Sequence, residues 1–408
     1  MIALIRVLNK GRSRTERVRA WLVTAGLGVA TYLICTAVSL ADLDDDGGSL
    51  TGLALALLAL PVMGLVHLAN RLASATRERR LAALRLAGAT PGDVRVLGAV
   101  EAGVLALSGS LGGAAGYVIT HLAGPITQVP VVVTLVALAA VLSGARAGRH
   151  VVASPLGVSR VPQPRDPRAL DLLLVLAGVG LFVLGVVVKG RFPFFGGHGA
   201  VVSMAAGLVL LLFGVTLAAT WLIRWCAGRA GRRARSPETL LAARLVEADP
   251  RAWARALSVV ALAVFFGAGA GAQQAGRPYS EAHALVDVAL FVALATAAVA
   301  VLVHQAEELI DQRRAFAALA AAGVPEAALG AVLVRKAVIA ALPVCAVAAV
   351  TGAAAVVLPL PDYTVQELGW VVVRGVLMVG IGVLATVVVA LAARPLLRGT
   401  LAVERLRA

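Results

Sequence analysis

Glu101, Lys336 and Arg374 are ionisable side chains that stand inside long apolar stretches of this sequence. A charge inside a membrane-spanning segment is unfavourable unless it has a partner or faces water, so each is a candidate functional residue. Glu101 and Lys336 are 235 residues apart, at equivalent positions of a repeat described below. Two hypotheses follow: they pair with each other, or each extends to nearby lipid headgroups. Arg374 lies deeper, and we expect it to line a polar pathway or to pair with Asp362 or Glu367.

Residue arrangements for covalent catalysis or metal binding are not evident, so we expect no catalytic residue and no metal site in this chain. An ATP-binding P-loop requires Gly-Lys-Ser/Thr, and none of the three lysines has that setting. The cysteines and the histidines at the ends of apolar stretches lack metal-ligand spacing. They are Cys35, Cys226, Cys345, His67, His121 and His304.

The composition predicts an all-α polytopic membrane protein. Hydrophobic residues make up 60% of the chain and charged residues only 14%, and the charges cluster between apolar blocks of about 20 residues, the length that crosses a bilayer. The net charge of +15 accompanies only 4% aromatic residues, which disfavours nucleic-acid binding. We expect about ten transmembrane helices. They are 20–41, 51–70, 94–122, 129–145, 169–188, 200–223, 256–273, 284–305, 331–357 and 368–392.

The distribution of arginine predicts the orientation of these spans. Residues 1–19, 71–95 and 224–255 are rich in arginine, whereas the loop 42–49 is acidic and has no basic residue. Because positively charged loops stay in the cytoplasm, both termini are expected there. Arginine far outnumbers lysine, which indicates a GC-rich bacterial genome. We therefore expect a multi-pass protein of the bacterial cytoplasmic (inner) membrane.

An internal repeat joins two parts of the sequence in the same orientation. The segment 79–89 (RRLAALRLAGA) and the segment 314–324 (RAFAALAAAGV) share Arg, Ala-Ala-Leu and Ala-Gly at an offset of 235 residues. Each precedes a proline and a long apolar span. We therefore predict two parallel four-helix units, 1–160 and 231–408, with two additional helices in the linker 161–230. Parallel repeats disfavour a carrier built from inverted repeats.

The arginine-rich segment after the second span resembles the FtsX-like permease family of ABC transporters, which includes MacB and the bacitracin-type peptide exporters. The resemblance is carried by residues 77–80 (RERR), by Leu84-Arg85 and Gly88-Ala89, and by the glycine-rich span that follows Glu101. The second copy departs from the pattern, with Ala320 in place of arginine. The very short outer loops also differ from the family, whose members carry a large extracellular domain.

The resemblance implies a function without catalysis in this chain. We expect the permease subunit of an ABC transporter of the mechanotransmission type, exporting or extracting an amphipathic peptide, lipid or antibiotic. Two copies of a separate cytosolic ATPase would bind ATP and Mg, and this chain would hold no cofactor. An additional extracellular or membrane accessory protein is a further partner that the resemblance leaves open. The alternative is a permease-like signalling transducer that relays the state of the ATPase to a membrane or cell-wall partner without substrate flux.

The segments 72–88 and 311–323 are the expected contact sites for that ATPase. Residues 71–89 form an amphipathic pattern, so the arginines either meet anionic lipid headgroups or contact the ATPase. The resemblance favours the ATPase. The expected coupling residues are Arg79, Arg80, Leu84, Arg85, Gly88, Arg314, Leu319 and Gly323. In the third span, Gly112 and Gly116 have the spacing that lets two helices approach closely.

Overall fold

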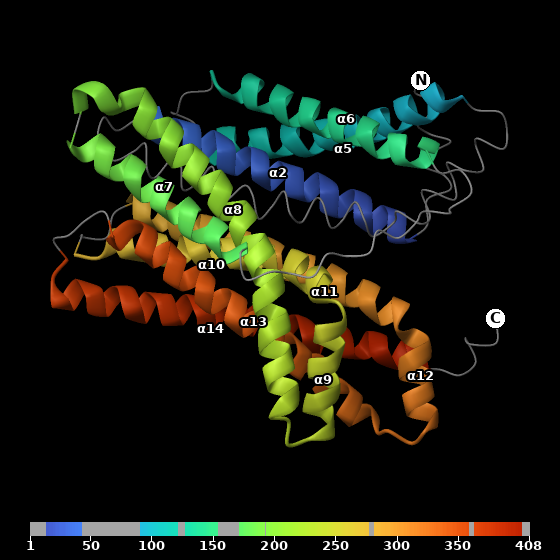
Figure 1. Ribbon diagram of the computed structural model, residues 1–408. Coiled ribbons are helices and arrows are strands. Elements are labelled where there is room, and N and C mark those ends of the chain that lie inside the picture. Colours follow the sequence, from blue (N-terminus) through green and yellow to red (C-terminus); the bar gives the residue numbers. More distant parts are fainter. Residues whose placement is uncertain are drawn as a thin grey trace. The chain divides into compact units, whose positions relative to one another are not determined.

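The computed structural model describes residues 14–42, 90–120, 127–153, 171–191, 193–276, 281–358 and 363–401 (Figure 1). The secondary structure of these residues is entirely helical, which confirms the expected all-α class for this part of the chain. The helices are α2 (Arg14–Asp42), α5 (Pro91–Thr120), α6 (Val129–Ala153), α7 (Asp171–Arg191), α8 (Pro193–Arg232), α9 (Pro237–Ala248), α10 (Pro250–Gln274), α11 (Glu281–Asp311), α12 (Arg313–Ala321), α13 (Glu326–Val357) and α14 (Val365–Leu401).

Several of these helices contain segments that could cross a membrane. Within the described residues, five segments are long and apolar enough: Gly98–Thr120, Pro250–Gln274, Val286–Ala306, Glu326–Val357 and Val365–Arg394. The chain is thus compatible with a multi-pass helical membrane protein. The predicted second span, 51–70, lies outside the described residues, and the total of about ten spans stays a prediction.

The chain forms two compact units, Met1–Pro164 and Arg165–Ala408. The first contains α2, α5 and α6, and the second contains α7 to α14. The predicted additional helices, α7 and α8, therefore belong to the same compact unit as the second predicted quartet. The finer division at residues 160 and 230 stays a prediction.

In the first unit, α2 and α5 approach at their backbones. A Cβ atom at Gly113 of α5 would lie 2.0 Å from the carbonyl oxygen of Gly28 of α2, and only glycine leaves room for this contact. The expected close approach through Gly112 and Gly116 is wrong in register: no atom lies within 4 Å of a Cβ built at Gly112. One residue along a helix is a rotation of about 100°, which turns Gly112 away from α2.

In the second unit, α10 and α13 form the centre. A Cβ atom at Gly352 of α13 would lie 2.1 Å from the carbonyl oxygen of Phe265 in α10. The helix α14 contacts both α10 and α13. The first unit has the same order of pairing, because α2 contacts α5 and α6 contacts both. Each unit therefore contains a three-helix set that is held together by a glycine contact between its first two members.

Two long helices begin where the sequence supplies a capping box. At the start of α5, the backbone N–H of Thr90 donates to Asp93 Oδ2 at 2.9 Å, and the N–H of Asp93 donates to Thr90 Oγ1 at 3.2 Å. At the start of α14, Thr364 and Glu367 make the same two contacts at 2.7 and 3.3 Å. These bonds satisfy N–H groups that the first turn of a helix leaves without partners.

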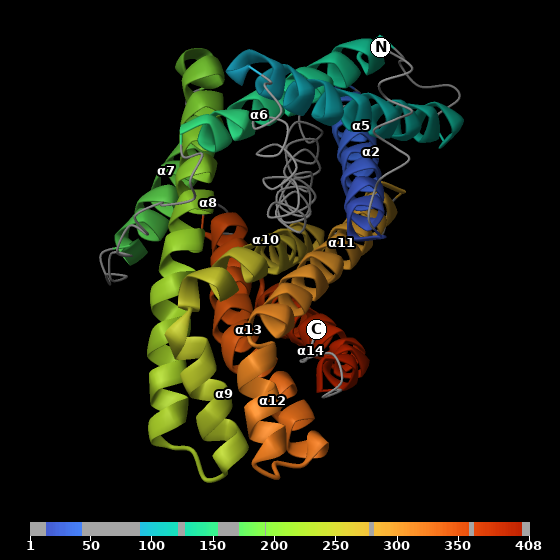
Figure 2. The same cartoon turned by 90° about the vertical axis from the view of Figure 1, so that its right-hand side faces the viewer.

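The short helices α9 and α12 lie at one end of the second unit, where α9 packs beside the end of α8 (Figure 2). Buried Ala242, Ala243 and Val246 of α9 pack in the space beside α8 and α13. In the sequence, 224–255 is recognisable only as a basic segment, and α9 is not among the predicted helices. Ser236 caps this helix by accepting a hydrogen bond from the backbone N–H of Thr239, a signal that could have located its start.

Candidate functional site

A buried ion pair joins three helices at the end of the second unit where α9 and α12 lie. Lys336 of α13 is only 2% exposed, and its Nζ lies 2.8 Å from Glu308 Oε2 of α11. The other carboxylate oxygen, Glu308 Oε1, accepts a hydrogen bond from Gln312 Nε2 at 3.1 Å. The Lys336 Nζ also lies 5.3 Å from the ring centroid of Trp253 in α10. The ammonium group thus has a carboxylate and an aromatic face as partners.

Aromatic packing extends this cluster. His304, one turn before Glu308, meets Trp253 edge to face with ring centroids 5.2 Å apart. Both Trp253 and His304 are buried. A buried charge is tolerated when it is paired and hydrogen-bonded, and its removal from the pair is strongly unfavourable. Lys336, Glu308, Trp253 and His304, which we call the buried cluster, therefore tie α10, α11 and α13 to one another.

The predicted roles of Lys336 need correction. Its side chain is buried and pairs with Glu308, so it does not extend to the headgroups. Glu101 is half-buried in α5 of the first unit, and its pairing with Lys336 stays a prediction. Glu308 is not among the residues predicted from the sequence, because it follows the predicted span 284–305 instead of lying inside it. An acidic residue one turn beyond an apolar stretch was the signal available.

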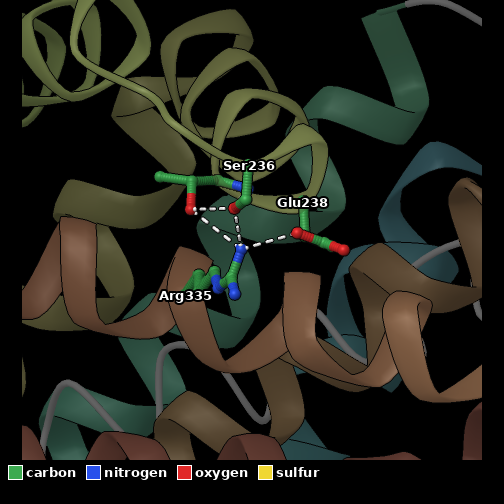
Figure 3. A network of polar contacts seen from close by, with 4 residues as sticks. Ser236, Glu238 and Arg335 are labelled. Carbon is green, nitrogen blue, oxygen red and sulfur yellow. Dashed lines mark hydrogen bonds and ion pairs between the residues drawn. The ribbon is translucent and has the colours of Figure 1, made fainter.

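Arg335, the neighbour of Lys336, contacts a different helix (Figure 3). Its Nη1 donates to Ser236 Oγ, and also to Glu238 Oε2 and Thr239 Oγ1 at 2.9 Å each. These acceptors form the first turn of α9. A backbone hydrogen bond at Glu238 and then the Ser236 hydroxyl lower the pKa of the Glu238 carboxyl, so the partner of Arg335 is charged at neutral pH. Consecutive residues of α13 thus bind α9 on one side and the buried cluster on the other.

The corner between α12 and α13 is tightly defined. Gly323 has φ of +88°, the left-handed conformation that ends many helices. The N–H of Val324 donates to the carbonyl of Leu319 at 3.1 Å, and the N–H of Gly323 donates to that of Ala320 at 3.0 Å. This is a Schellman motif, which ends α12 and redirects the chain into α13.

Apolar packing fixes this corner to the long helices. Phe316 of α12 is buried in a cluster with Leu309, Leu329, Leu333 and Ala393, and Leu319 and Val324 pack against the same cluster. Of the predicted coupling residues, Leu319 therefore packs into the unit and Gly323 makes the turn. The side chain of Arg314 lies outside the described residues, as do Arg79, Arg80, Leu84, Arg85 and Gly88.

A second ion pair lies at the opposite end of α11. Arg374 Nη2 of α14 donates to Asp287 Oδ1 at 2.6 Å. Gly271 of α10 makes room for this arginine, because a Cβ there would lie 2.2 Å from Arg374 Cγ. The expected pairing with Glu367 is wrong: Glu367 instead caps α14 through Thr364. Asp362, the other expected partner, lies outside the described residues.

The two ion pairs on α11 are spaced like the two surfaces of a bilayer. Asp287 and Glu308 are 21 residues apart, which corresponds to about 31 Å along an α-helix. The hydrocarbon core of a bilayer is about 30 Å thick. The candidate span Val286–Ala306 of α11 thus has an acidic residue with a basic partner at or just beyond each end.

The contacts described above are ion pairs and apolar packing that link helices of the second unit to one another. Among the residues that the structure describes, no three His, Cys, Asp or Glu side chains are grouped so that they could hold a metal ion. Comparison of the chain with protein-family models, with curated proteins and with solved structures gives no match. The physical arrangement of the second unit is therefore the basis for a functional proposal.

Proposed function

We propose that this chain is the membrane subunit of an ABC transporter of the mechanotransmission type, driven by two copies of a separate cytosolic ATPase. The cargo class is an amphipathic peptide, lipid or antibiotic. The observation that carries the proposal is the junction of α12 with α13, where a short surface helix is fixed to a long span. The sequence resemblance to FtsX-like permeases supports the same assignment.

The junction can convert a push on α12 into movement of α13. Phe316 buries α12 against Leu329 and Leu333 in the first turns of α13. The helix α13 continues for 32 residues, a length of about 48 Å. A displacement at α12 would thus reach the far side of the bilayer through one continuous helix, and no side chain would need to take part in covalent chemistry.

The contacts of Arg335 and Lys336 decide what moves together with α13. Arg335 binds the first turn of α9, and Lys336 binds Glu308 of α11 above the ring of Trp253 in α10. Separating Lys336 from Glu308 would leave two buried charges without partners, which is strongly unfavourable. The ends of α9, α10, α11 and α13 would therefore move as one body when the ATPase closes.

Co-purification tests the coupling to an ATPase. Ala318 is exposed on α12, and the substitution Ala318→Glu places a negative charge where the acidic surface of an ATPase would approach. We expect a P-loop ATPase to co-purify with the wild-type chain and to be lost from this variant and from Leu84→Ala/Arg85→Ala. Val365→Glu is the matched control, because Val365 is 88% exposed at the start of α14, the other end of the unit. Retention of the ATPase by Ala318→Glu and by the Leu84 and Arg85 variant would refute the proposal.

Reconstitution separates transport from the signalling alternative. Transport predicts substrate-stimulated ATP hydrolysis together with extrusion of substrate from vesicles. A signalling transducer would show ATP-dependent control of a membrane or cell-wall partner with no flux. Glu308→Ala, which breaks the buried cluster, should reduce the coupling of ATP hydrolysis to flux in the first case.

A further inference from the structure

One row of side chains along α8 changes from apolar to aromatic to cationic. Residues spaced four apart are neighbours on a helix surface, and each step turns about 40° around the axis. The row consists of Leu217, Trp221, Trp225 and Arg229, with Arg233 directly after the end of α8, and we call it the α8 ladder. Leu217 is 45% exposed and Trp225 is 47% exposed. Exposed large apolar and aromatic side chains in one row indicate a surface that meets something other than water.

The contacts within the α8 ladder order its polar end. The rings of Trp221 and Trp225 stack with centroids 6.1 Å apart and an interplanar angle of 13°. The guanidinium carbon of Arg229 lies 5.4 Å from the centroid of the Trp225 ring. A guanidinium held over an aromatic face keeps its N–H groups available at the ring's edge, where they can bind an anion in a fixed position.

The other side of α8 is occupied by α9. Ala227 is fully buried, and a Cβ at Gly231 would lie 3.5 Å from Cβ of Ala243 in α9. These positions lie about 200° around the helix from Trp225 and Arg229 respectively. Trp225 and Arg229 are therefore on the side turned away from α9, and packing of the α8–α9 hairpin does not explain these two residues.

We propose that the α8 ladder binds an anionic phospholipid. Leu217 and Trp221 would contact the acyl chain and the glycerol region, and Arg229 and Arg233 would bind the phosphate headgroup. Arginine near a bilayer surface attracts anionic lipid, and tryptophan prefers the boundary between hydrocarbon and headgroups. The bound lipid would set how far the hairpin of α8 and α9 projects from the bilayer.

The order of residues favours lipid over an acidic protein. From Leu217 to Arg233 the α8 ladder spans 16 residues, about 24 Å of helix. The change from apolar to aromatic to cationic follows the change from hydrocarbon to interface to headgroup. The predicted span 200–223 ends between Trp221 and Trp225. A protein bound in water would contact only the arginine end and would not require Leu217 and Trp221 in the same row. The proposal does not depend on coupling to an ATPase.

Lipid binding to the full-length chain tests this site. The delipidated protein in detergent would be titrated with phosphatidylglycerol and with phosphatidylcholine, and bound lipid would be counted by native mass spectrometry. We expect preference for phosphatidylglycerol, and a loss of about ten- to thirtyfold in its affinity for Arg229→Gln/Arg233→Gln. Arg229→Lys/Arg233→Lys keeps the charge and should retain most of the binding.

The matched control is Arg235→Gln/Arg244→Gln, which removes two exposed arginines of the same hairpin that lie off the α8 ladder. This control should bind phosphatidylglycerol like the wild type. Equal binding of both lipids by the wild type, or equal loss in ladder and control variants, would overturn the proposal. Loss of a protein partner with unchanged lipid affinity would identify the face as a protein contact and would also overturn it.

Discussion

The two ion pairs on α11 differ in how far they are removed from water. In the pair Lys336–Glu308 the side chains are 2% and 13% exposed, whereas in Arg374–Asp287 they are 18% and 34% exposed. The protein itself encloses both charges of the first pair, whereas both side chains of the second pair keep more exposed surface. The end of the unit beside α9 and α12 is therefore the rigid one. At the other end of α11, the ion pair Arg374–Asp287 can open at a smaller cost in free energy.

The largest expected effect is at the buried end. Glu308→Ala would leave the Lys336 ammonium buried with no counter-charge and should lower the free energy of unfolding by about 3–5 kcal/mol. Chemical or thermal unfolding in detergent measures this change. The double variant Glu308→Gln/Lys336→Met, which removes both charges, should recover most of the loss. A Glu308→Ala variant no less stable than Asp287→Ala would contradict the distinction between the two ends.

Trp253 should rank second. Trp253→Leu removes the aromatic face beneath Lys336 and the edge contact with His304, and a desolvated cation–π contact contributes about 2 kcal/mol. The same unfolding measurement applies. Trp370→Leu is the control, because Trp370 is 47% exposed on α14 and should change stability by less than about 0.5 kcal/mol. Equal effects of the two substitutions on stability would mean that the Trp253 ring does not stabilise the buried cluster.

The partly exposed pair should have a smaller effect. Asp287→Asn weakens the contact with Arg374, and ion pairs that water can reach contribute about 0.2–1 kcal/mol. High salt should abolish the difference between this variant and the wild type, because salt screens charges near water. The loss caused by Glu308→Ala should persist in high salt. If the stability loss of Asp287→Asn did not depend on salt, the pair Arg374–Asp287 would be shielded from solvent like the pair Lys336–Glu308.

The smallest expected effect is a pH dependence at the link between α13 and α9. The pKa of Glu238 is lowered from its ordinary 4.5 in the folded protein, so its contribution to stability is fully present above that value. It is lost as the pH falls through the lowered pKa, when the carboxylate that binds Arg335 becomes protonated. The difference in melting temperature between wild type and Glu238→Gln should thus vanish in strong acid. A difference that grows on acidification would reverse the sign and contradict this account.

The positions of the long helices could be read from the chain because hydropathy is a local property. Each predicted span within the described residues overlaps a helix, and α10, α11, α13 and α14 coincide with segments long and apolar enough to cross a bilayer. The helix α9 was missed because its short apolar face, including Leu241 and Val246, is surrounded by arginines. The basic composition of 224–255 gives no indication of a helix there, and the capping residue Ser236 is the one local signal for the start of α9.

The candidate site was predicted only in part. Lys336 and Arg374 stand out as unusual charges in the sequence, since an apolar neighbourhood is visible there. Their partners, Glu308 and Asp287, were not found, because partner choice depends on how each helix is rotated and where helices cross. The same reason explains the glycine contact in the first unit, which uses Gly113 rather than its neighbour Gly112.

The sequence by itself determined the helical class, the segments apolar enough to enter a bilayer and the few charges that require a partner within them. These properties depend on residues close together along the chain. Only the tertiary structure decided that Lys336 is buried on Glu308, that Arg335 next to it binds α9, and that Arg374 reaches Asp287. These contacts join residues from different helices, and the rotation of each helix, which close packing fixes, selects them.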